Sequence, residues 1–120
     1  MLNTNKILAF AAVAEGATGL ALVIAPALVV RVLVGLDVSI DGELLGRCFG
    51  IALIALALAC WPAVSASGAT RAMLAYNGLI ALYLTYLGAV LHLYGLLLWP
   101  AAALHAVVAL LLIGAMRRTA

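Results

Sequence analysis

Four long apolar runs constrain the fold of this chain more than any other feature of its sequence. They cover residues 7–30, 44–64, 72–93 and 96–116. A helix needs about 20 apolar residues to cross the roughly 30 Å hydrocarbon core of a bilayer, and each run is long enough. The runs are apolar on every face, whereas the strands of a membrane barrel alternate apolar and polar residues. We therefore expect an all-α polytopic membrane protein, in which residues 1–120 form one antiparallel bundle of four transmembrane helices.

The composition excludes an ordinary soluble domain. Hydrophobic residues make up 69% of the 120 residues and charged residues only 8%, against about half and about a quarter in typical soluble domains. The formal net charge is +2, and the basic residues form no run longer than two. We expect no nucleic-acid partner, because such binding needs a concentrated basic surface.

The charged residues between the runs predict the topology. The segment 36–43 holds three acids and is expected to be a wet loop. Four crossings place both termini on one side, and the basic residues favour that side by four to two. The positive-inside rule then predicts a multi-pass protein of a bacterial inner membrane with both termini in the cytoplasm. The four basic residues on the side of the termini are Lys6, Arg71, Arg117 and Arg118, and the two on the other side are Arg31 and Arg47.

Proline and glycine suggest where the helices bend and where they pack. Pro26 either kinks the first helix or begins a separate amphipathic turn that runs through Arg31 toward Gly35. Helix packing in lipid depends on small residues that let backbones approach closely. We expect such seams within the monomer at Gly16 and Gly19 in the first helix, at Gly46, Gly50 and Ala57 in the second, and at Gly78, Ala81 and Gly88 in the third.

Glu15 is the charged residue that most needs a physical explanation, because it lies about eight residues into the first apolar run. An acid in the centre of a membrane helix costs about 2.5 to 3.5 kcal/mol on insertion scales. Tyr76, Asn77 and His105 are its candidate partners at similar depth. Two roles remain open: a protonatable carboxylate that carries a proton or binds a cation, and a hydrogen-bonded acid that holds the helices together.

The other polar residues suggest surface structure rather than catalysis. Near the loop we expect a solvated ion-pair cluster, with binding of a lipid headgroup or partner as the alternative. His92 and His105 differ in depth, which argues against haem, and the sequence carries no recognised catalytic motif. We expect no enzyme activity, no metal site and no cofactor. The residues of the expected cluster are Arg31, Asp37, Asp41, Glu43 and Arg47.

Two families show a resemblance to this pattern. Ala14-Glu15 followed by Gly19 resembles the small multidrug resistance transporters, in which a glutamate of the first helix binds protons and cationic drugs alternately. Residues 83–88 (YLTYLG) do not reproduce the aromatic-glycine signature of that family. The layout of the whole chain resembles small four-helix bacterial membrane proteins, loosely similar to the DoxX-like group, and this resemblance implies architecture more than activity. It rests on Glu15, Gly19-Leu20, Pro26, Arg31 with Gly35, Arg47 with Gly50, Tyr76-Asn77 and His105.

The sequence thus favours an accessory or scaffold protein of unknown biochemical activity. Such a protein acts through contacts with membrane lipid, with other membrane subunits or with a second copy of itself. The alternative is a proton-coupled transporter of a small molecule that uses Glu15.

Overall fold

The computed structural model describes residues 3–62 and 66–119. Within these residues the chain forms five helices and no strand, which confirms the all-helical prediction. Four of the helices are long and apolar enough to cross a membrane, and the exception is the short helix α2. The helices are α1 (Thr4–Ile24), α2 (Pro26–Val34), α3 (Ile40–Ala59), α4 (Ala66–Ala89) and α5 (Leu98–Thr119).

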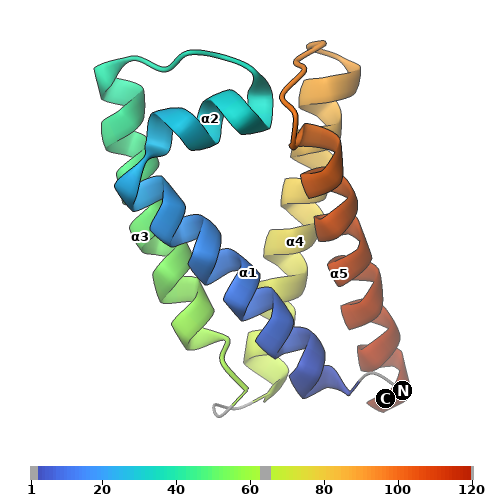
Figure 1. Cartoon of the computed structure of the whole chain (residues 1–120). Helices are drawn as coiled ribbons and strands as arrows, with labels where there is room; N and C mark the ends of the chain where they lie inside the picture. Colours follow the sequence, from blue (N-terminus) through green and yellow to red (C-terminus); the bar gives the residue numbers. More distant parts are fainter. Residues whose placement is uncertain (1–2, 63–65, 120) are drawn as a thin grey trace.

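The four long helices are arranged as two antiparallel pairs (Figure 1). Helix α1 packs along α3, and α4 packs along α5, while contacts between the two pairs are far fewer. The start of α1 and the end of α5 lie at the same end of the molecule, which we call the terminal end. Helix α2 lies across the opposite end, which we call the loop end, and connects α1 to the segment before α3. The long helices therefore form two hairpin-like units rather than one evenly packed bundle.

Pro26 divides the first apolar run into two helices. Proline lacks a backbone N–H and disfavours helical geometry in the residue before it. Ala25 accordingly leaves the helix with φ −140° and ψ 64°, and Pro26 becomes the first residue of α2. Helix α2 ends at Gly35, whose φ of 77° suits glycine best. The expected helix over 7–30 is thus interrupted, and the separate turn through Arg31 is a full helix.

The remaining helix ends differ from expectation by a few residues. The Ser39 side chain accepts a hydrogen bond from the Gly42 amide at 3.3 Å and starts α3 at Ile40. The expected loop over 36–43 is therefore shorter, and its last four residues are helical. Helix α4 begins at Ala66, so most of the expected turn over 65–70 is helical too. Helix α3 ends at Ala59, and the expected end at residue 64 lies outside the described residues.

Small residues form the seam between α1 and α3. A Cβ atom on Gly19 would lie 2.6 Å from the carbonyl oxygen of Gly50. A Cβ atom on Gly50 would lie 2.6 Å from the carbonyl oxygen of Gly19. A Cβ on Gly16 would meet Ala57 at 3.4 Å. These residues confirm the expected packing of the first two long helices. The expected seam at Gly78 is wrong, because a Cβ there would meet nothing within 4 Å.

Two apolar clusters join the helix pairs, one near each end of the molecule. The lower cluster, near the terminal end, packs α1 against α4 and α5 through Leu8, Met73 and Leu112, each fully buried. The upper cluster, near the loop end, packs Leu33 and Val34 of α2 against α4 and α5. A backbone hydrogen bond of 2.9 Å from the Leu97 amide to the Val32 carbonyl also joins α2 to the start of α5. The core of the upper cluster is formed by Leu84, Leu87, Leu98 and Ala102.

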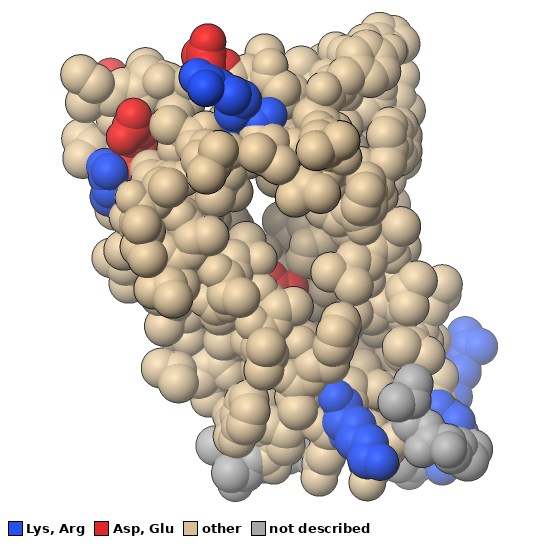
Figure 2. All heavy atoms as spheres, in the orientation of Figure 1, with Lys and Arg blue, Asp and Glu red and all other residues tan. Residues whose placement is uncertain are grey.

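Between the two clusters the helix pairs separate. Figure 2 shows an opening below α2, with α1 on one side and the α4–α5 pair on the other. An acidic side chain is visible in the wall of this opening, well apart from the acidic side chains at the loop end. We call this opening the window.

Candidate functional site

Glu15 lies near the middle of α1 and is only 2% exposed. Its carboxyl group points toward the other helix pair, where it is hydrogen-bonded to the side chain of Tyr76 on α4. The short side chains of Ala11 and Ala12, one turn earlier on α1, are buried in the lower cluster. Glu15 thus lies one turn beyond the part of α1 that packs against α4 and α5 in the lower cluster. The window begins at this point.

Asn77 and His105 form the second part of the site. The Asn77 amide nitrogen donates to the Met73 carbonyl oxygen, one turn earlier on α4, at 2.9 Å. The Asn77 Oδ1 atom lies 2.7 Å from Nδ1 of His105 on α5. Asn77 is 1% exposed, so these contacts replace its contacts with water.

Both parts meet at the imidazole ring of His105. Its Nδ1 atom lies 3.5 Å from Oε1 of Glu15, and its ring meets the ring of Tyr76 edge to face, with centroids 5.9 Å apart. The four side chains of Glu15, Tyr76, Asn77 and His105, which we call the polar cluster, therefore come from three helices. Among the described residues, every buried side-chain nitrogen or oxygen atom has a hydrogen-bond partner.

The structure thus brings together all four residues that the sequence suggested for one intramembrane site. The link from Asn77 to the Met73 carbonyl was not predicted from the sequence. A signal for it exists, because an Asn inside a helix often bonds the carbonyl four residues earlier. That link sets the orientation of the amide and hence the face that Asn77 presents to His105.

The charged residues at the loop end form two separate ion pairs, not one cluster. Arg31 binds Asp37 at 2.5 Å, with both side chains largely exposed. Arg47 lies 3.5 Å from Glu43, one helical turn away, and donates to the Val23 carbonyl of α1 at 3.3 Å. Figure 2 shows the two groups apart. An exposed pair such as Arg31–Asp37 stabilises a fold by about 1 kcal/mol at most.

Asp41 takes no part in an ion pair with the described residues. It lies in the first turn of α3, where an acidic side chain interacts favourably with the helix dipole. The two ion pairs and Asp41 thus lie at the loop end, apart from the polar cluster.

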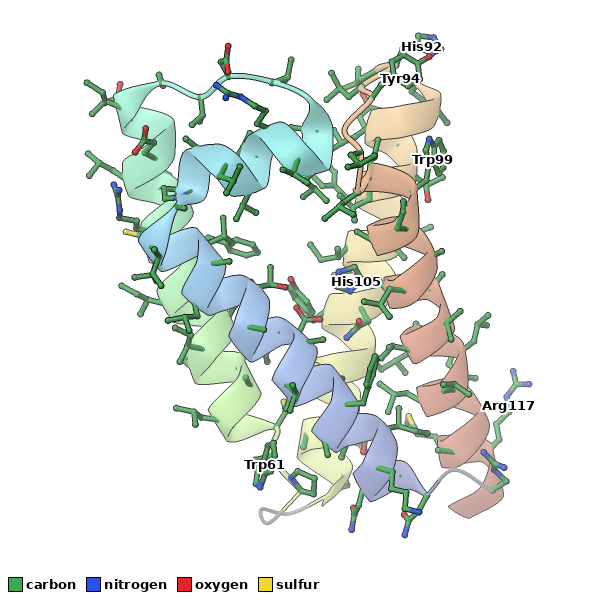
Figure 3. All side chains as sticks on the ribbon, in the orientation of Figure 1. Trp61, His92, Tyr94, Trp99, His105 and Arg117 are labelled. Atoms are coloured by element: carbon green, nitrogen blue, oxygen red, sulfur yellow. The ribbon has the colours of Figure 1, made fainter. Side chains whose placement is uncertain are left out.

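The remaining candidate residues lie away from the polar cluster. Figure 3 places His92 at the far end of α4 and His105 between α5 and α1. Tyr83 and Tyr86 are 57% and 47% exposed, so they face outward from α4, unlike Tyr76. Among the described residues no group of three or more His, Cys, Asp or Glu side chains could hold a metal ion. Cys48 is exposed, Cys60 is buried, and both are free thiols.

The polar cluster has the chemistry of a proton-binding site. A carboxyl group, a phenol and an imidazole can each hold or share a proton, and they are in mutual contact. Ionisable groups this deep in a membrane helix commonly mark proton or substrate pathways.

No protein-family model matches the chain, and neither a curated protein nor a solved structure matches it.

Proposed function

We propose that this chain is a proton-coupled carrier of a small molecule in a bacterial inner membrane, with Glu15 as the proton-binding group. The observation that supports this most is the burial of Glu15 at mid-helix, in contact with a tyrosine and a histidine of the other helix pair. A purely structural acid could be replaced by an amide, whereas a carrier needs the carboxyl group to gain and lose its proton.

The division into two helix pairs provides two units whose relative position can depend on the protonation of Glu15. Glu15 belongs to the α1–α3 pair, while Tyr76 and His105 belong to the α4–α5 pair. The apolar contacts between the pairs belong to the lower and upper clusters, whereas Glu15 joins the pairs through polar groups. A change of protonation would then favour one relative position of the pairs over another, which is what a gated carrier requires.

Proton flux in reconstituted vesicles tests this proposal. A proton gradient across vesicles that contain the wild-type chain should drive uptake of a substrate found by screening, and substrate addition should move protons in turn. Glu15→Gln keeps the size of the side chain but cannot ionise, so it should abolish both fluxes. Glu43→Gln, which alters an acid of the loop end, is the matched control and should retain them. A Glu15→Gln variant with unchanged fluxes would leave only the structural role.

An accessory role in a larger assembly is the second candidate, and helix α3 supports it. Among the four long helices α3 has the smallest buried share, because it packs chiefly on α1. Its outer face exposes Leu45, Ile51 and Leu58 at 61% or more. This face suits either lipid or another membrane protein. Native mass spectrometry from mild detergent distinguishes these, and repeated recovery of the chain alone would exclude the accessory role.

A further inference from the structure

The window opens sideways, between helices, rather than along the membrane normal. It lies between the lower and upper clusters, below α2 and between the two helix pairs (Figure 2). The helices on both sides of it are long enough to cross the membrane. In the orientation that these helices require, the window faces hydrocarbon. A molecule that enters it from the bilayer must therefore be soluble in lipid.

The hydrogen bonds of Asn77 determine which polar atom such a molecule meets. The Met73 carbonyl can only accept a hydrogen bond, so the Asn77 amide nitrogen must face it and Oδ1 must face His105. Because Oδ1 is an acceptor, the Nδ1 atom of His105 must carry the hydrogen. In a neutral imidazole the other nitrogen, Nε2, is then a hydrogen-bond acceptor.

The Nε2 atom is available to a ligand. No described residue donates a hydrogen bond to Nε2. Among the described residues, every side-chain nitrogen or oxygen atom that is buried has a partner, so an atom without one is not buried. Nε2 is therefore an accessible atom, in agreement with the 14% exposure of the His105 side chain. Figure 3 places this ring between α5 and α1, beside the window.

We infer that the window binds a neutral, lipid-soluble molecule with a hydroxyl group at one end, which donates a hydrogen bond to Nε2 of His105. An acceptor in the wall selects a donor in the ligand, and entry through hydrocarbon disfavours a charged group. An apolar phenol or alcohol has this chemistry. This inference rests on the proposed function and names the substrate class of the same site.

Two probes test the inference, a phenol and its methyl ether, in which a methyl group replaces the donated hydrogen. The wild-type chain, labelled with ¹⁵N at its two histidines, is placed in lipid nanodiscs and titrated with 4-nonylphenol or with its methyl ether. Without probe, Nε2 of His105 should give the signal of an unprotonated nitrogen. The phenol should shift that signal and bind about tenfold more tightly than the ether, the effect of one good hydrogen bond. His92, at the far end of α4, serves as an internal reference, and His92→Asn assigns the two signals.

Several results would overturn the inference. One is a proton on Nε2 rather than on Nδ1 without probe, and another is an equal response to phenol and ether, including no response to either. Glu15→Gln in the same titration separates this inference from the proposed function, because it leaves the bond between Asn77 and His105 in place. Phenol binding without proton flux would contradict the carrier alone, and proton flux without a shift of Nε2 would contradict the hydroxyl ligand alone.

Discussion

Gly19 of α1 and Gly50 of α3 pack backbone to backbone, with room for no side chain between them. A Cβ atom on either would lie 2.6 Å from the carbonyl oxygen of the other. Lipid is as apolar as the helices, so this close approach, rather than the exclusion of water, holds α1 to α3.

Gly19→Ala should therefore destabilise the fold, by about 1 to 3 kcal/mol, because backbone atoms must move to admit the methyl group. Gly78→Ala is the matched control, since its Cβ would meet nothing within 4 Å. It should leave stability unchanged or raise it by up to about 1 kcal/mol, the helix preference of alanine over glycine. Unfolding by SDS titration in mild detergent measures both. Equal effects of the two substitutions would contradict the seam.

Tyr76→Phe should destabilise the contact between the helix pairs by about 1 to 2 kcal/mol. It removes the hydroxyl that is hydrogen-bonded to the buried Glu15 carboxyl and leaves the ring in place. Tyr83→Phe removes a hydroxyl from an outward-facing ring of the same helix and should have little effect. A double-mutant cycle with Glu15→Gln should show a coupling of about 0.5 kcal/mol or more. Additive losses would mean that the two side chains do not interact.

Gly95→Ala should detach α2 from the connection between α4 and α5. A Cβ on Gly95 would overlap the carbonyl group of Leu33, which is backbone and cannot rotate away. The amide of Leu97, which donates to Val32 at 2.9 Å, should then exchange its hydrogen faster. Hydrogen exchange followed by mass spectrometry measures this, with Gly68→Ala, a position in open space, as the control. Unchanged protection of Leu97 would show that α2 is held by its apolar contacts alone.

Reporter fusions test the predicted orientation in the membrane. The basic residues at the terminal end, with no acid among the described residues there, predict a cytoplasmic location for both termini. A fluorescent protein that folds only in the cytoplasm should be bright at the C-terminus. Alkaline phosphatase, which is active only outside, should be active when inserted after Asp37. The reverse pattern would invert the topology.

The sequence predicted the parts of this fold that depend on local physics. The length and apolarity of the four runs predicted the long helices. The missing backbone N–H of Pro26 suggested a break at the start of α2. The Gly19 and Gly50 seam followed from residue size. The relation of the two helix pairs could not be predicted, because it depends on which apolar faces meet, and these faces look alike in sequence. Gly78 illustrates this: its small size suggested a contact that the arrangement of the pairs does not make.

The polar cluster was predictable because polar side chains are rare in these helices. Glu15, Tyr76, Asn77 and His105 stood out at similar depth, and such groups need partners in an apolar surrounding. The direction of the hydrogen bonds had a weaker signal, the i−4 carbonyl within reach of an Asn inside a helix. That carbonyl belongs to the backbone of Met73, which every residue type would supply, so it does not stand out in the sequence. The window left no trace in the sequence, since it results from the separation of two packed units.

The most direct test of the proposed proton site is the infrared spectrum of its carboxyl group. Difference spectra of the chain in nanodiscs, recorded across the pH range in which it stays folded, report the C=O stretch of a protonated carboxyl in an apolar surrounding. We predict a band that appears and disappears with pH in the wild type and in Glu43→Gln and is missing from Glu15→Gln. A spectrum in which Glu15→Gln removes no titrating band would contradict the claim that Glu15 exchanges a proton.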